Sequence, residues 1–293
     1  MHGRKFDGEN IAASPVHANR FPRRQDAAFP GCLATGPQRY LRPFFRGLIP
    51  LTTLGRGLLD LFAPGFCREC HGSVGGTEPL CLGCLQKIEW IEGACFFCGF
   101  PPVAVSGRRL SGATERCAVC ANEHWAFDRA IAAGRYTGSL RRLVLCHKFH
   151  DDRAARRFLV SALYRACRRE RLYFSGATDG WMITSVPQHF GKRLFRGRDP
   201  GREIAAGLAS TLGRPYRQLL VKSRWTRAQM TLSRVERRRS PRGSIRLRRR
   251  ARPPRRVILV DDVLTTCTTA AECSRVLKLG GVRQVWVLSV ARS

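Results

Sequence analysis

The chain has 293 residues, enough for one or two domains, and its hydrophobic fraction of 44% is ordinary for a globular protein. No stretch approaches the roughly 18 uncharged apolar residues of a membrane span, and no basic-then-apolar export signal is visible, so we expect a cytoplasmic protein without a transmembrane segment. The formal net charge of +31, mostly from arginine, fits either a phosphate-rich partner or a background of solvated arginines.

The N-terminal part of the chain carries few signals of regular structure. Residues 1–45 show no sustained period of 3.6 or 2, so we expect a disordered lead there. Residues 48–62 have the spacing of a short amphipathic helix that ends at Pro64 and Gly65.

Cysteine pairs distinguish the next predicted domain, residues 46–122, which includes that helix. Its CxxC pairs account for eight of the 13 cysteines, and because cytosolic thiols stay reduced, metal explains them better than disulfides do. Two CxxC turns complete one closed tetrahedral site, which predicts two structural Zn²⁺ ions. The spacing leaves open whether consecutive pairs share an ion or the first joins the third and the second the fourth. The expected ligands are Cys67, Cys70, Cys81, Cys84, Cys95, Cys98, Cys117 and Cys120.

From Trp125 onward the pattern changes to alternating strands and helices. The last unit is strand, crossover helix and strand, which predicts a parallel sheet with helices on both faces. Asp199 and Pro200 are typical of the cap and first position of a helix. Residues 222–255 form a long basic connection. We expect strands at residues 130–136, 181–186, 217–221, 257–263 and 284–290, and helices at 139–149, 154–171, 199–212 and 269–279.

The segment 257–269, VILVDDVLTTCTT, has the strongest chemical pattern in the chain. A buried strand ends in two acids, where ligands bind in open α/β sheets, and a threonine-rich turn leads into a helix. Amides at the helix start suit a phosphate, whereas Asp261 and Asp262 suit neutral hydroxyls or a cation. The plain alternative is a strand-to-helix turn whose acids only cap the helix. We favour a ligand that combines a phosphate, a diol and a metal-chelated pyrophosphate.

This segment closely resembles the motif with which type I phosphoribosyltransferases bind 5-phosphoribosyl-1-pyrophosphate (PRPP). Other stretches narrow the resemblance to the ComF family of competence-associated, phosphoribosyltransferase-like proteins with N-terminal zinc ribbons. The resemblance covers about residues 50–293 and implies an α/β, type I phosphoribosyltransferase fold at 125–293, with consecutive cysteine pairs sharing each zinc ion. The similar stretches are CREC, CLGC, FDRAIAAGRYTGSLRRLVLCHKFHDDRAARRFL, SVPQHFGKRLFRGRD, RAQMTLSRVERRRSPRGSI and VLSVAR.

The resemblance also implies roles for individual residues. Asp261 and Asp262 would bind the ribose 2′- and 3′-hydroxyls of PRPP, and Lys148 matches a family lysine. The pyrophosphate loop would be residues 187–198, beginning at Pro187, with Mg²⁺ bridging the pyrophosphate. The family's mobile loop corresponds to residues 229–238. The 5-phosphate would be held by Thr265, Thr266, Cys267, Thr268 and Thr269, and the pyrophosphate by Arg193 and Arg196.

The sequence departs from the family pattern at a few positions. Cys267 stands where the family has glycine, and a side chain there is expected to tighten or distort the phosphate cradle. The family's RGFNQ is RGRDP here, and Ser240 replaces an asparagine. We expect His147 and His150 at the surface or capping their helix, rather than on a phosphate.

The sequence supports two alternative functions. The first is a PRPP-binding phosphoribosyltransferase-like protein linked to DNA uptake, natural transformation or nucleotide metabolism. The second is a non-catalytic zinc- and nucleic-acid-binding accessory protein with a sensory or vestigial PRPP site. The second would bind single-stranded DNA and proteins of the DNA-uptake machinery. Intact acids and threonines favour the first, and the arginine excess and Cys267 favour the second.

Overall fold

The computed structural model describes residues 65–75, 78–101, 116–170, 180–188, 197–222 and 243–293. The chain divides after Pro30, and every described residue lies in the part from Gly31 to Ser293. Several predictions therefore fall outside the described residues: the disordered lead, the helix at 48–62, Arg193, Arg196, Ser240 and the loop 229–238. Among the described helices, none is both long and apolar enough to cross a bilayer.

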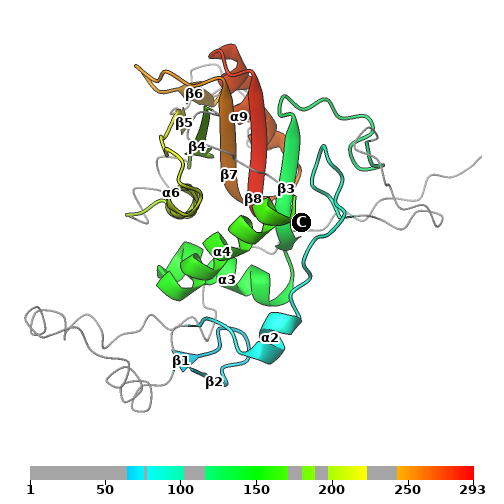
Figure 1. Ribbon diagram of the computed structural model, residues 1–293, viewed down its shortest axis with the longest axis vertical. Helices are drawn as coiled ribbons and strands as arrows, with labels where there is room; N and C mark the ends of the chain where they lie inside the picture. Colours follow the sequence, from blue (N-terminus) through cyan, green and yellow to red (C-terminus); the bar gives the residue numbers. More distant parts are fainter. Residues whose placement is uncertain (1–64, 76–77, 102–115, 171–179, 189–196, 223–242) are drawn as a thin grey trace, which may run out of the picture. The chain divides into compact units, whose positions relative to one another are not determined.

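A parallel four-stranded sheet forms the centre of the described fold (Figure 1). Its order is β3-β8-β7-β4, with strands Arg129–Arg135, Gln284–Arg292, Arg256–Leu264 and Trp181–Ser185. Val260 of β7 pairs with Leu288 of β8 and Ser185 of β4, so all three strands run in register to one edge. The acid pair lies near the end of β7, two residues before Leu264, and is therefore placed toward the carboxyl edge of the sheet.

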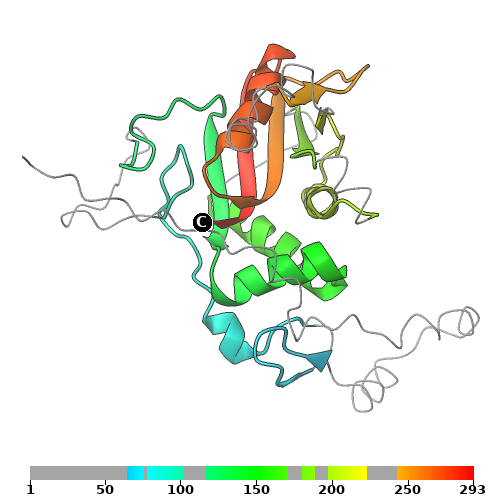
Figure 2. The ribbon, with the colours of Figure 1, turned by 180° about the vertical axis from the view of Figure 1, so that it is seen from behind.

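Helices cover both faces of this sheet. The helices α3 (Gly138–His150), α4 (Arg153–Arg169) and α6 (Pro200–Leu212) share one core cluster with Ile258 and Val260 of β7. The helix α9 (Thr268–Leu279) shares the other cluster with Val257 and Leu259, on the opposite side of the sheet (Figure 2). Because side chains alternate along a strand, β7 serves both cores at once. The predicted α/β class, with helices on both faces, is confirmed.

Local sequence signals set the ends of these helices. Asp199 accepts a hydrogen bond from the Arg202 backbone N–H at 3.1 Å, and Pro200 begins α6, as predicted. Gly213 ends the same helix in the left-handed conformation, with φ of 63°. Asp152 caps α4 by accepting from two backbone N–H groups of its first turn, at 2.9 and 3.0 Å.

The basic connection contains a strand that the sequence pattern did not predict. The strand β6 (Ile245–Leu247) pairs antiparallel with β5 (Leu220–Lys222), which lies slightly later than the strand expected at 217–221. Ile245 is buried in the same cluster as α9. Three residues followed by a run of arginines give too short an alternation to stand out, so the prediction of an unbroken connection was wrong here.

The cysteine-rich region has little regular structure. It contains the two-residue strands β1 (Gly65–Phe66) and β2 (Ser73–Val74), which pair antiparallel, and the short helix α2 (Leu82–Gln86). Backbone hydrogen bonds join it to β3: Ile91 N–H donates to the Ala133 carbonyl at 3.1 Å. The first cysteine pair lies in the turn between β1 and β2, the second lies at the start of α2, and the other two lie between α2 and β3.

Candidate functional site

The two acids at the end of β7 have different partners. Lys148, in the last turn of α3, donates from Nζ to Oδ2 of Asp262 at 2.6 Å. Asp261 accepts instead from the Asp262 backbone N–H at 2.9 Å. The Lys148 and Asp262 side chains retain 29% and 18% of their exposure, so this ion pair borders solvent. Lys148 thus compensates the charge of Asp262, whereas Asp261 has a backbone partner.

Burial and the neighbouring charges separate the pKa values of these groups. Burial, followed by the Asp262 charge, raises the pKa of Asp261 to about 8. Burial would also raise the pKa of Asp262, but the charge and hydrogen bond of Lys148 outweigh it and hold that pKa below its usual value. Asp261 is therefore a carboxyl that holds its proton near neutral pH, beside an ionised carboxylate. Such a pair can both donate to and accept from hydroxyl groups.

The threonine-rich turn begins directly after β7, three residues beyond Asp262. Thr265, Thr266 and Thr268 are exposed, and the Oγ1 atoms of Thr266 and Thr268 lie 2.8 Å apart. The helix α9 begins at Thr268, one residue before the predicted start. Because α9 is 12 residues long and its first amides are free of intrahelical partners, this turn is suited to an anion.

Cys267 adopts the backbone conformation that favours glycine. Its φ is 59° and its ψ is −3°, in the left-handed region, at the N-cap of α9. Its side chain is only 3% exposed and packs in the core cluster of α9. Burial raises the pKa of the thiol to about 11, so it stays protonated. The side chain therefore fills the core beneath the turn, while the exposed side is formed by threonines.

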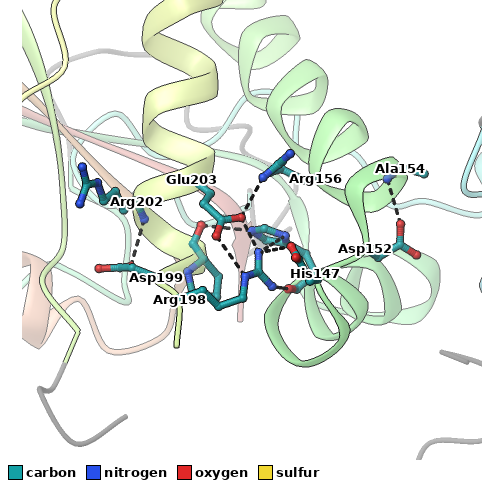
Figure 3. Close-up of polar contacts among 10 residues, drawn as sticks. His147, Asp152, Ala154, Arg156, Arg198, Asp199, Arg202 and Glu203 are labelled. Atoms are coloured by element: carbon teal, nitrogen blue, oxygen red, sulfur yellow. Dashed lines mark hydrogen bonds and ion pairs between the residues drawn. The ribbon is translucent and has the colours of Figure 1, made fainter. Parts of the chain in front are cut away.

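Arg198 anchors the end of the predicted pyrophosphate loop (Figure 3). It donates to the His147 carbonyl at 2.6 Å and to Glu203 from Nε at 3.0 Å, and its Nη2 lies 2.9 Å from Asp151. Arg156 adds a second cation to Glu203 at 3.0 Å. This network fixes the Arg198 end of the loop beside the turn of α3 that carries Lys148.

Pro187, at the other end of this loop, directly follows the sheet edge at Val186.

His147 differs from its predicted surface position. It is 1% exposed, and its Nε2 lies 3.1 Å from the Pro200 carbonyl. Burial lowers its pKa, with the neighbouring Arg198 charge acting in the same direction. A neutral ring that donates from Nε2 joins α3 to α6, so a structural role replaces the predicted one. The alternation of apolar positions in α3 could have indicated this burial, since His147 lies four residues after Leu143.

Two cysteine tetrads are present, each built from consecutive CxxC pairs. In each tetrad all four Sγ atoms lie within 4.8 Å of one another, and the closest pairs, such as Cys98 with Cys117, are 3.5–3.7 Å apart. Four thiolates at about 2.3 Å from a tetrahedral Zn²⁺ ion lie about 3.8 Å apart, so the donor set and its size fit zinc. The tetrads are Cys67, Cys70, Cys81 and Cys84, and Cys95, Cys98, Cys117 and Cys120.

The thiols of the second tetrad titrate unequally. The hydrogen bond with Cys98, together with other bonds to the thiolate, lowers the pKa of Cys95 to about 4 against the effect of burial. The same hydrogen bond, and then burial, raises the pKa of Cys98. One thiolate stabilised by protonated neighbours is the pattern expected when four thiols share a site that a cation would neutralise.

Comparison with known proteins gives relatives along most of the chain. No family model matches it. It is 28% identical over 235 residues to Competence protein F of Haemophilus influenzae, covering 78% of this chain and 96% of that protein. It is also 28% identical to DNA utilization protein YhgH of Salmonella typhimurium and 26% identical to that of Escherichia coli O157:H7, over 98% of each.

One solved structure is similar to part of this chain. Glutamine PRPP amidotransferase from B. subtilis, complexed with ADP and GMP, is 24% identical with a TM-score of 0.30. The match covers 46% of this chain and 25% of that one, so it spans about a quarter of the amidotransferase. The curated relatives confirm the resemblance to the ComF family that the sequence motifs indicate, and the chain is a relative of Competence protein F along most of its length.

Proposed function

We propose that this protein binds PRPP at the carboxyl end of β7. The observation that carries the proposal is one juxtaposition: Asp261 beside an Asp262 that is paired with Lys148, and an exposed threonine turn that opens α9. The diol of a ribose would meet the acid pair, and its 5-phosphate would meet Thr265, Thr266, Cys267, Thr268 and Thr269. The resemblance to the ComF family supports the same assignment.

The proposed chemistry is displacement of pyrophosphate at C1 of PRPP. Mg²⁺ bound with PRPP would stabilise the charge that develops on the leaving pyrophosphate. Pro187, Arg193 and Arg196 belong to the loop proposed to hold that group, and the Arg198 network fixes one end of this loop. Asp262 is already paired with Lys148, so the acid edge orients the ribose without adding a second full negative charge beside the phosphates.

Titration calorimetry with Mg²⁺ and PRPP tests this proposal. The double variant Asp261→Asn/Asp262→Asn removes both carboxyl groups and their charge, and leaves the buried residues of β7 in place. PRPP affinity should fall at least tenfold, about 1.4 kcal/mol or more. Glu92→Gln, which changes an exposed acid of the cysteine-rich region, is the matched control and should leave affinity unchanged. Equal PRPP binding by the double variant and the wild type, both folded by circular dichroism, would show that the assignment is wrong.

A second candidate function rests on a surface at the opposite edge of the sheet. The segment that leads into β7 contains seven exposed arginines and no acid between residues 243 and 256. The Arg283 N–H donates to the Arg255 carbonyl at 2.8 Å, which brings an eighth exposed arginine to this arginine strip. Such a strip is suited to the phosphates of single-stranded DNA. The strip consists of Arg246, Arg248, Arg249, Arg250, Arg252, Arg255, Arg256 and Arg283.

Both candidate functions fit the same domain plan. We assign residues 46–122 to a double zinc ribbon and 125–293 to the phosphoribosyltransferase-like domain, which acts in the cytoplasm where thiols remain reduced. The names of the curated relatives, a competence protein and a DNA utilization protein, support a role in DNA uptake together with proteins of that machinery. A role in nucleotide metabolism is the outcome expected if PRPP is turned over.

A further inference from the structure

Arg292 is buried behind the threonine-rich turn, residues 265–268, which is the proposed phosphate turn. It is 4% exposed, although it carries a permanent charge. Its Nη1 donates to the carbonyl oxygens of Leu264 at 3.0 Å and Ser293 at 2.9 Å, and also to that of Thr265. A buried guanidinium that donates hydrogen bonds to the backbone carbonyls of a turn fixes the shape of that turn.

These contacts set the direction of two backbone amides. Every described peptide bond is trans, and in a trans peptide the C=O and the next N–H point in opposite directions. When the Leu264 and Thr265 carbonyls point to Arg292, the N–H groups of Thr265 and Thr266 must point away from it. Both threonines are exposed. Arg292 therefore directs these two amides outward, where a phosphate would accept from them.

The same guanidinium lies against the second cysteine tetrad. Its carbon Cζ is 5.1 Å from the ring centroid of Phe100, which packs on the cluster of Cys95, Cys98, Cys117 and Cys120. The Phe100 carbonyl also accepts from the Cys95 N–H at 2.9 Å, within the turn that carries two of the thiols. A metal ion that holds this turn would therefore also hold the aromatic face on which Arg292 rests.

We propose that Arg292 is a positioning residue that couples the second tetrad to the phosphate turn. Metal bound by this tetrad keeps Phe100 in place, Phe100 supports Arg292, and Arg292 orients the Thr265 and Thr266 amides. The ligand side of this coupling rests on the proposed PRPP function, but the mechanical side does not. Because coupling between two sites is reciprocal, a ligand on the turn should also stabilise metal in the second tetrad.

Hydrogen–deuterium exchange tests the mechanical side without PRPP. In the zinc-loaded protein, Arg292→Ala should speed exchange in the peptide that spans the turn by about tenfold, and Arg292→Lys, which keeps a donor, should restore part of the protection. Phe100→Leu and removal of zinc by a chelator should each have the same effect. Arg168→Ala, which removes an exposed arginine of α4 outside both candidate sites, is the matched control. Unchanged exchange in Arg292→Ala and Phe100→Leu, with both variants folded, would overturn the proposal.

Zinc release and PRPP binding test the reciprocal side. With a chromogenic chelator, zinc should leave the wild type in two phases, and saturating PRPP should slow one of them. Arg292→Ala should abolish that slowing and weaken PRPP binding about tenfold, while Arg168→Ala should do neither. If the wild type does not bind PRPP, the proposed function fails, and the exchange experiment alone decides the coupling. If PRPP binds but neither affinity nor zinc release depends on Arg292, the coupling is wrong and the proposed function stands.

Discussion

At the scale of single residues, the acid pair shows how one strand end can offer two kinds of carboxyl group. Asp261 and Asp262 are neighbours in sequence, yet only Asp262 receives the Lys148 charge, at 2.6 Å. Burial acts on both groups, so the position of one cation decides which of them ionises. A diol contains donors and acceptors, and a pair in mixed protonation states matches both.

Asp261 should make stability depend on pH. Its pKa is about 8 in the folded protein against 3.8 for an ordinary aspartate, so between these values the folded state holds a proton that the unfolded state has lost. The contribution of Asp261 to the free energy of unfolding is full below pH 3.8 and should fall as pH rises towards 8. Urea unfolding of wild type and Asp261→Asn at pH 5.5 and 8 measures this, and the variant should show the smaller decline. A decline of equal size in both proteins would contradict the assignment.

Cys267 allows the cost of a left-handed backbone to be measured separately from ligand binding. Cys267→Gly relieves about 1 kcal/mol of backbone strain but removes a buried side chain of similar value, so stability should change by less than about 1 kcal/mol. Cys267→Val keeps an apolar side chain but places a β-branched residue at positive φ, and should lose about 2 kcal/mol or more. Thermal unfolding of the three proteins compares these costs.

The same variants report on the phosphate cradle. Because the Cys267 side chain packs inward, PRPP affinity of Cys267→Gly should stay within about threefold of wild type. Much tighter binding by the glycine variant would show that the cysteine crowds the cradle after all.

At the scale of elements, the cysteine turns are small units whose stability depends on metal. The tetrads contain four thiols each, and the elements around them are two-residue strands and a five-residue helix. Such short elements bury too little apolar surface to fold alone. Metal ligation is therefore expected to supply much of the folding free energy of this region.

The purified protein should contain close to two zinc ions per chain, because each tetrad has the size of one tetrahedral site. Elemental analysis together with thiol titration measures this, and Cys81→Ser with Cys84→Ser should reduce the content to about one ion. A folded protein with no metal and eight reactive thiols would contradict the zinc assignment.

The order and type of the elements could be predicted from the sequence, whereas their long-range contacts could not. Apolar runs and caps located every described strand of the central sheet and all four long helices, because those signals are local. The pairing of Lys148 with Asp262 joins residues 114 positions apart and depends on how α3 packs against β7. The burial of Arg292 was hidden for the same reason, since its partners belong to a different strand and turn.

At the scale of the whole described fold, the two candidate binding surfaces lie at opposite edges of the sheet. Arg256 begins β7 and Asp261 lies five residues along it, a distance of roughly 17 Å in an extended strand. The acid pair therefore has its own local field, separated from the arginine strip by a buried sheet. Separation of this kind would allow PRPP and nucleic acid to bind at the same time.

Single-stranded DNA binding should reveal whether the arginine strip contacts phosphates. The logarithm of the affinity should fall linearly with the logarithm of the salt concentration, and the triple variant Arg249→Ala/Arg250→Ala/Arg252→Ala should reduce the slope by about 2. The exposed arginines of α4 give a matched control, Arg153→Ala/Arg157→Ala/Arg168→Ala. PRPP affinity should be the same in both triple variants. Weak binding at low salt, or equal slopes in both variants, would assign the strip to solvated surface.

The strand order of the sheet has a consequence for the way this chain is made on the ribosome. The strands β3 and β4 are synthesised before their partners in the sheet, β8 and β7, which are the last of the described strands. Arg129 of β3 can pair with Trp286 of β8 only after roughly 150 further residues have been synthesised. Until then the apolar side chains of β3 and β4 remain without their final cover, so the nascent chain is exposed to aggregation until β7 and β8 have been made. The sheet is thus expected to assemble in one step, after β8 has left the ribosome.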